Sequence, residues 1–331
     1  MGHVSRACLI YSYLASVNSY SVHFVIPRNE HAIEFIKEGI KPRYFDESIV
    51  DKNQALIQVL TSVNANILII DTLHIKSMQD SINFTKTINC QVVIIVDNSE
   101  KKEFDVDVIV NGHPKQLDYN YENNSGKYLV GPKYFIMDTQ YSIRQLTKPK
   151  ETVRSILLTV GGSDHNDLMF RILNVIGKIK PTIFLLIISS KATGYSNKLK
   201  SLVENNPNPY KLLFDVPNLT PYWEQCDMAI TAGGNTLFER IAIRCPGATI
   251  CQLEQQMEIA DTFENLGLNS NIGFGPELTD IALEEGIQFF IDSFDERLKQ
   301  YEMSETFIEG KGLIYLGDKI KNLLKDVNNE L

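Results

Sequence analysis

The chain has 331 residues, of which 44% are hydrophobic and 22% are charged. This length suggests about two domains of roughly 150 residues each, and the apolar content excludes a disordered chain. The net charge is -9, from 32 Lys and Arg against 41 Asp and Glu. Because binding to nucleic acid needs a basic surface, we exclude nucleic acid as a partner.

No apolar run approaches the ~20 residues that a membrane-spanning helix needs, and the first residues lack the layout of a signal peptide. We therefore expect a cytoplasmic protein without stable membrane insertion, whose oligomeric state the sequence leaves open. The five cysteines and six histidines show no CxxC, HExxH or comparable spacing. We accordingly expect neither a bound metal nor a cofactor.

Short β-branched runs alternate with longer amphipathic segments, which is the pattern of βα units on a parallel sheet. In the first half we predict strands at 21–27, 67–71, 91–97 and 106–110, and helices at 7–15, 29–38, 52–64 and 75–88. Asn, Tyr, Gly, Pro and Lys then accumulate, so 116–150 is predicted to be a linker. This makes residues 1–115 an N-terminal Rossmann-like domain.

The alternation restarts after the linker, and residues 151–331 are predicted to form a C-terminal, nucleotide-binding Rossmann-like domain with a helical tail. Its predicted strands lie at 155–160, 182–188, 211–214, 228–231 and 248–252. Two or three amphipathic helices without a strand follow from about 278 to 331. The predicted fold class is therefore α/β with two Rossmann-like domains.

Two Gly-Gly turns follow predicted strands of this second domain. Gly161 and Gly162 come before Ser163 and Asp164, one of which would cap the next helix. Gly233 and Gly234 come before Asn235 and Thr236, which would cap another. Glycine lets a phosphate approach the backbone, and free N–H groups at a helix start favour an anion. A single turn of this kind can equally be a tight βα connection, but two on one sheet edge favour a nucleotide.

Glu239 lies about one turn inside the helix that follows the second glycine turn, and Arg240 comes next. A carboxylate at this position either completes a capping box or accepts hydrogen bonds from a vicinal diol such as ribose. Both interpretations stay open on the sequence alone.

His3 lies at the start of a predicted helix, between Gly2 and Arg6. The helix dipole favours the neutral imidazole there, which suits a general base, although a terminal histidine can also be merely solvated. Two further strand ends carry aspartates, Asp71 and Asp97, which could line a ligand cleft or simply cap helices.

Three segments, in this order and spacing, resemble the UDP-sugar hydrolases of pseudaminic acid biosynthesis and the related spore coat polysaccharide biosynthesis proteins. They are Gly2-His3-Val4-Ser5-Arg6, Leu157 to Asp164, and Ala229 to Arg240, continued by Glu254-Gln255-Gln256. The resemblance implies the glycosyltransferase B fold, two Rossmann-like domains facing a cleft. Members begin with a strand and a glycine-rich turn before the Gly-His pair, so we expect the first strand of the N-terminal domain to be missing here.

The resemblance implies hydrolysis of UDP-2,4-diacetamido-2,4,6-trideoxy-beta-L-altropyranose to UDP and free sugar, with inversion and without a metal. It makes His3 the base that activates water and Glu239 the ligand of the ribose. The remaining expected substrate-binding residues are Gly2, Arg6, Gly161, Gly162, Ser163, Gly233, Gly234, Asn235, Thr236, Arg240, Gln255 and Gln256. Gln255 stands where Asn is typical, which could mark a different sugar.

Two alternatives remain for the same fold. A UDP-sugar-dependent glycosyltransferase would pass the sugar to an acceptor hydroxyl, and a catalytically inactive homologue would bind UDP and release nothing. A nicotinamide-dependent dehydrogenase is excluded, because no GxGxxG follows any predicted strand.

Overall fold

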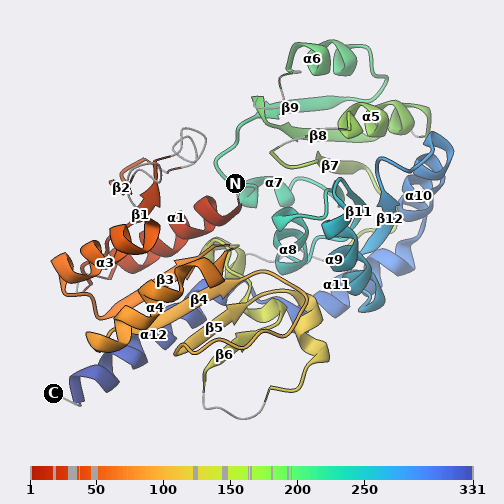
Figure 1. Cartoon of the computed structure of the whole chain (residues 1–331). Coiled ribbons are helices and arrows are strands. Elements are labelled where there is room, and N and C mark those ends of the chain that lie inside the picture. The colour runs from red at the N-terminus through yellow and green to blue at the C-terminus, as the bar shows by residue number, and fades with distance from the viewer. Residues whose placement is uncertain are drawn as a thin grey trace. The chain divides into compact units, whose positions relative to one another are not determined.

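The computed structural model describes residues 2–17, 20–28, 36, 38–45, 51–72, 74–121, 126–143, 148–162, 164, 166–179, 182–191, 194 and 196–329. The chain forms two compact domains (Figure 1). The N-terminal domain comprises residues 1–139 and 311–331, and the C-terminal domain comprises residues 140–310. Each domain is built on a parallel sheet with helices, as the alternating sequence pattern predicts.

The sheet of the N-terminal domain has the order β3-β4-β5-β6, and a separate parallel pair joins β1 to β2. The bounds of its strands are β1 Val25–Pro27, β2 Arg43–Phe45, β3 Ile67–Asp71, β4 Gln91–Val96, β5 Val108–Asn111 and β6 Tyr128–Val130. Its helices are α1 Gly2–Ala15, α3 Lys52–Val63, α4 Gln79–Thr87 and α12 Gly312–Asn329, with short 3-10 turns at η1 Ile75–Met78, η2 Pro114–Asp118 and η3 Pro132–Tyr134.

Helices cover both faces of the four-stranded sheet, because β4 carries β-branched residues that alternate between its two faces. Val93 and Ile95 pack with residues of α1 and α12, among them Ile10 and Leu316. On the other face, residues of β4 such as Ile94 pack with residues of α3 and α4. This packing fixes α1 against the sheet, and with it the position of the residues at the start of α1.

The C-terminal domain has one six-stranded parallel sheet with the order β12-β11-β10-β7-β8-β9. Its strands are β7 Ser155–Thr159, β8 Phe184–Ser189, β9 Tyr210–Phe214, β10 Met228–Thr231, β11 Gly247–Cys251 and β12 Ser270–Phe274. Its helices are α5 Leu168–Ile179, α6 Ser196–Glu204, α7 Thr220–Trp223, α8 Asn235–Ala242, α9 Glu254–Asn265, α10 Asp280–Asp292 and α11 Phe294–Phe307, and η4 spans Thr139–Ser142.

The order of this sheet reverses between β7 and β10. From β7 the chain adds β8 and β9 on one side, and from β10 it adds β11 and β12 on the other. In open α/β sheets, a ligand binds at the carboxyl ends of the strands at such a reversal. Thr159 and Thr231 end β7 and β10 in register with each other. Both predicted glycine turns therefore begin at the point where the topology favours a ligand.

Two parts of the predicted domain division are wrong. The expected linker 116–150 contains β6, which pairs with β5, so the first sheet extends to Val130. The expected C-terminal tail is divided, since α12 belongs to the N-terminal domain. The reason is its apolar stripe, because Leu313, Leu316 and Ile320 bury themselves against the first sheet.

Three short strands, β2, β6 and β12, are absent from the sequence-based assignment, and none of their residues is fully buried. Arg interrupts the apolar pattern of β2, Asn and Gly interrupt that of β12, and β6 has only three residues. The other strands lie within a few residues of their predicted bounds. Most of the predicted helix 29–38 lies outside the residues that the structure describes. Within the described part of the chain, no helix is both long and apolar enough to cross a membrane.

Arg297 on α11 holds together three segments of the C-terminal domain. Its guanidinium donates to Phe290 O and Ile291 O at the end of α10, at 2.8 and 2.7 Å, and to Glu151 O at 2.6 Å. The side chain is fully buried, and this burial lowers the pKa of its guanidinium. Arg297 therefore satisfies carbonyl groups that the helix end would otherwise leave without a partner.

Replacing Arg297 by Met is expected to lower the free energy of unfolding of this domain by about 2 kcal/mol, because buried carbonyls lose charge-assisted hydrogen bonds. Urea unfolding followed by the fluorescence of Trp223, the single tryptophan, measures the change. Lys299→Met, at a partly exposed position of the same helix, is the control. A loss below 0.5 kcal/mol, the range of ordinary surface substitutions, would show that Arg297 does not hold these segments together.

Candidate functional site

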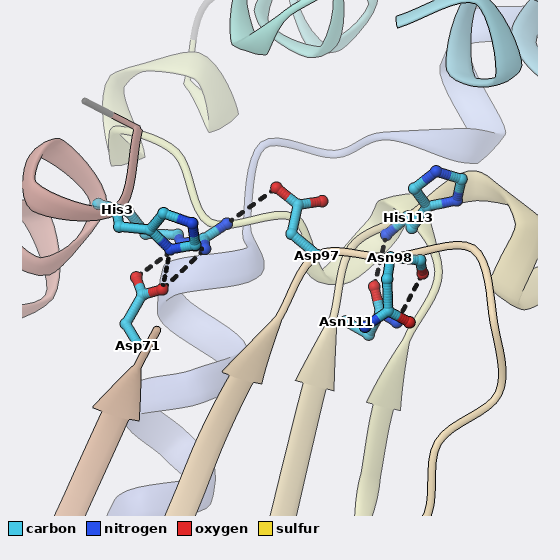
Figure 2. A network of polar contacts seen from close by, with 7 residues as sticks. His3, Asp71, Asp97, Asn98, Asn111 and His113 are labelled. Atoms are coloured by element: carbon cyan, nitrogen blue, oxygen red, sulfur yellow. Dashed lines mark hydrogen bonds and ion pairs between the residues drawn. The ribbon is translucent and has the colours of Figure 1, made fainter. Parts of the chain in front are cut away.

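The N-terminal domain gathers charged side chains where its strands end. Asp71 is the last residue of β3, Asp97 follows β4, and His3 faces Asp71 from the first turn of α1 (Figure 2). Arg6, three residues further along α1, contacts both carboxylates. His3 and Arg6 are three residues apart, which puts them on the same face of the helix. Segments 65 or more residues apart in the sequence thus meet at one edge of the sheet.

His3 is oriented by Asp71. Its Nδ1 lies 2.6 Å from Asp71 Oδ1. A carboxylate can only accept, so Nδ1 carries the hydrogen and Nε2 of the neutral ring keeps a lone pair. Asp71 is 5% exposed, whereas the His3 side chain is 31% exposed. A buried carboxylate therefore fixes the tautomer of a histidine that is open to solvent, the arrangement that a general base requires.

Arg6, an expected substrate ligand, is instead engaged with the protein's own carboxylates. Its Nε donates to Asp71 Oδ2 and its Nη2 to Asp71 Oδ1, both at 2.8 Å, and its Nη1 donates to Asp97 Oδ2 at 3.4 Å. The residue is 9% exposed. Arg6 therefore holds Asp71 in a bidentate ion pair, and its expected role in substrate binding stays a prediction.

The charges of this network compensate each other. Burial by itself would raise the pKa of Asp71, but hydrogen bonds from Arg6 and His3 outweigh it and lower that pKa. Burial would likewise lower the pKa of Arg6, but its bonds to Asp71 and the charge of Asp97 raise it. Asp71 is therefore an anion at neutral pH, as it must be to stabilise a proton on His3.

The first glycine turn of the C-terminal domain is open but its helix is capped. Gly161 has φ of +86°, and a Cβ built on Gly161 or Gly162 would meet no atom within 4 Å. The carboxylate of Asp164 accepts from Leu168 N and Met169 N at 2.8 and 3.0 Å. The start of α5 is thus capped by the protein's own carboxylate, as the sequence predicts for one of Ser163 and Asp164, and substrate binding at this turn stays a prediction. Ser163 lies outside the described residues.

The second glycine turn differs in having an uncapped helix. Gly234 is the N-cap of α8, so Asn235 and Thr236 are its first residues rather than its caps as predicted. Among the described residues, no N-cap side chain accepts a hydrogen bond from the first N–H groups of α8 or of the neighbouring α9. Both helices follow adjacent parallel strands, so two helix N-termini with open N–H groups lie at the same sheet edge. This is where an anionic diphosphate would be stabilised.

Gln256 is oriented toward the second turn. Its Oε1 accepts from Gln252 N at 2.8 Å, which leaves the amide Nε2 as a donor. That Nε2 would lie 3.8 Å from a Cβ built on Gly234. The structure thus brings Gln256 to the predicted phosphate site, whereas Gln255 is an exposed residue of the first turn of α9 and Gly2 an exposed residue of α1.

Glu239 and Arg240 have different environments. Glu239 is half-buried and hydrogen-bonded to the hydroxyl of Tyr141, so it does not form a capping box. Burial, followed by the charge of Glu239, raises the pKa of Tyr141. Arg240 is fully buried and donates to Asn269 Oδ1 at 2.6 Å and to Cys245 O at 3.0 Å. The prediction of Arg240 as a substrate ligand is corrected, since its guanidinium is inside the domain.

Tyr141 joins the candidate site although its local sequence did not predict it. It lies in the stretch interpreted as a linker, yet it is only 2% exposed and contacts Glu239. The aromatic and apolar character of residues 134–141 was the available signal. Asp71 was noted only as a strand-end residue, and nothing in its local sequence indicates a partner 68 residues away.

The fold is the two-domain Rossmann-like architecture of glycosyltransferase B enzymes. It matches MurG of Acinetobacter baumannii with a TM-score of 0.70 over 97% of this chain and 96% of that one, at 12% identity. It matches the LpCGTa structure in complex with UDP with a TM-score of 0.60 over 96% and 95%, at 12% identity. At such identities the likeness concerns the fold alone.

Two relatives are similar in sequence. The spore coat polysaccharide biosynthesis protein SpsG of Bacillus subtilis (strain 168) is 24% identical over 351 residues, covering 99% of this chain and 94% of its own. The uncharacterized protein MJ1062 of Methanocaldococcus jannaschii is 26% identical over 277 residues, covering 80% of this chain and 55% of its own. No family model matches the chain.

Proposed function

We propose that this protein hydrolyses a UDP-linked diacetamido-trideoxy sugar, UDP-2,4-diacetamido-2,4,6-trideoxy-beta-L-altropyranose, to UDP and the free sugar with inversion. The observation that carries the proposal is the pair of His3 and Asp71, in which Nε2 of an exposed imidazole is held as an acceptor. Two comparisons support the substrate class: the name of the Bacillus relative refers to polysaccharide biosynthesis, and LpCGTa, whose fold is similar, was solved in complex with UDP.

The chemistry needs one proton transfer and one bond exchange. Nε2 of His3 takes a proton from water as the water oxygen forms a bond to the anomeric carbon. The bond between that carbon and the diphosphate oxygen breaks on the opposite face, which inverts the configuration. The imidazolium that forms is stabilised by Asp71, whose carboxylate stays ionised because Arg6 binds it. The proton later leaves to solvent.

The leaving group is the second requirement, because negative charge grows on the diphosphate as the bond breaks. In our proposal the N-termini of α8 and α9, with Gly233, Gly234, Asn235, Thr236 and Gln256, hold this diphosphate. Fixed N–H dipoles stabilise the developing charge. Gly161 and Gly162 leave room beside them, and Glu239 accepts from the hydroxyls of the ribose.

The test is incubation of the purified protein with this nucleotide sugar in buffer without an acceptor. We expect stoichiometric UDP and free sugar, with the inverted anomer seen by proton NMR before mutarotation equilibrates it. Release of UDP only after an acceptor hydroxyl is added would replace the proposal with a glycosyltransferase. Nucleotide sugar that stays intact while UDP binds would identify an inactive binding protein.

A further inference from the structure

Asp97, which the reaction above does not use, has a partly exposed carboxylate. Oδ2 lies 3.4 Å from Arg6 Nη1, and the side chain is 33% exposed. Among the described residues, this is its one hydrogen bond or ion pair, so Oδ1 has no protein donor. A carboxylate oxygen in this state accepts a hydrogen bond from any N–H or O–H group that approaches it.

The backbone behind Asp97 is fixed by buried amide side chains. Asn98 O accepts from Asn111 Nδ2 and from Gln116 Nε2, both at 3.0 Å. Gln116 Nε2 also lies 3.0 Å from Ser99 O, and both amide residues are 2% exposed. Asn111 is further held because its Oδ1 accepts from His113 N (Figure 2). Asp97 is thus on a loop that is ordered without a ligand, as a recognition residue needs to be.

Arg6 links Asp97 to the base. One end of its guanidinium, Nη2, is 3.1 Å from His3 Nδ1, and the other end, Nη1, is 3.4 Å from Asp97 Oδ2. His3 and Asp97 therefore contact opposite ends of one guanidinium. A pyranose ring that His3 serves carries N–H and O–H donors on several of its carbons, so it can present one of them to Asp97.

We infer that Asp97 is a specificity-determining residue whose Oδ1 accepts a hydrogen bond from a donor group on the sugar ring, an acetamido N–H or a hydroxyl. The inference rests on the proposed function. A charge-assisted hydrogen bond in a partly dry site contributes enough to select sugars that carry a donor at this position over those that do not. His3 and Asp97 then hold one sugar ring between them, while the diphosphate is bound independently.

The experiment uses the full chain with His3→Gln, in which turnover is slowed, and compares it with the His3→Gln, Asp97→Asn double variant. Calorimetric titrations measure Kd for the diacetamido nucleotide sugar and for UDP. We expect Asp97→Asn to raise Kd for the nucleotide sugar by about 10- to 100-fold and to leave Kd for UDP unchanged. Asp105→Asn, an exposed aspartate of the same domain, should change neither value.

An unchanged Kd for the nucleotide sugar overturns the inference, as does an equal weakening for UDP, which would indicate a structural role. In active protein, Asp97→Asn should raise KM with a smaller effect on kcat. If His3→Gln binds the nucleotide sugar no better than UDP, the proposed substrate and this inference both fail. If it binds the sugar better but Asp97→Asn has no effect, only the inference fails.

Discussion

Replacing His3 by Gln is expected to lower kcat for hydrolysis of the nucleotide sugar by about 10²- to 10⁴-fold, the usual contribution of a general base. Glutamine keeps a hydrogen-bonding side chain of similar reach but cannot take a proton from water. Because the diphosphate is bound by the C-terminal domain in our account, Kd for UDP should stay the same.

The matched control is His23→Gln, since His23 is an exposed histidine of the same domain. Among the described residues, its side chain is hydrogen-bonded only to the hydroxyl of Ser21. It should leave kcat within a factor of two of the unmodified protein. A His3→Gln protein that retains more than a tenth of the original kcat would show that another group activates the water.

Replacing Gly233 by Val is expected to raise Kd for UDP by about 100-fold, which corresponds to about 2.7 kcal/mol. A Cβ at this position would lie 2.8 Å from Gln256 Cβ and 3.0 Å from Cys251 Sγ, so the turn or α9 has to move. Either movement separates Gln256 from the uncapped start of α8. Isothermal titration with UDP measures the loss.

The control for this substitution is Gly177→Ala in the last turn of α5, where the added Cβ would lie 3.3 Å from the side chains of Asn206 and Pro207. This variant tests whether any added carbon in the domain reduces UDP affinity, and it should bind UDP normally. Thermal unfolding of both variants shows whether the fold is kept. If Gly233→Val folds and binds UDP as tightly as the original chain, the diphosphate does not lie at this turn.

The helices and strands that could be predicted from the sequence are those whose formation depends mainly on their own residues. β10 matches its predicted bounds because it is a short, wholly buried run next to a Gly-Gly turn. β6 could not be predicted, since its residues are only partly buried and it depends on pairing with β5. The position of α12 likewise depends on the sheet it packs against. Its apolar stripe predicts that one face is buried but does not indicate which of the two sheets buries it.

The residues of the candidate site also fall into two groups, those predictable from their local sequence and those that only the fold brings together. Positions near glycine turns were predictable as an anion site, because the chemistry of a helix start is local. Which turn keeps its N–H groups open depends on Asp164, one of the two residues predicted as the cap, which lies four positions before the first residue of α5. Arg240 lies in the segment that follows the second glycine turn, yet its guanidinium is buried and donates to Asn269 and Gln300. Only the folded chain brings these two residues near it. The pairing of His3 with Asp71 likewise needed the structure.

The central claim is that water attacks the anomeric carbon and that UDP leaves with its own oxygen. Hydrolysis in water enriched in ¹⁸O, followed by mass spectrometry of the UDP, tests it most directly, because the oxygens of UDP do not exchange with water as those of a free sugar do. The account predicts UDP without ¹⁸O, formed at the rate of sugar release. Incorporation of ¹⁸O into the β-phosphate would mean cleavage at phosphorus, and would contradict the roles given to His3 and the helix N-termini.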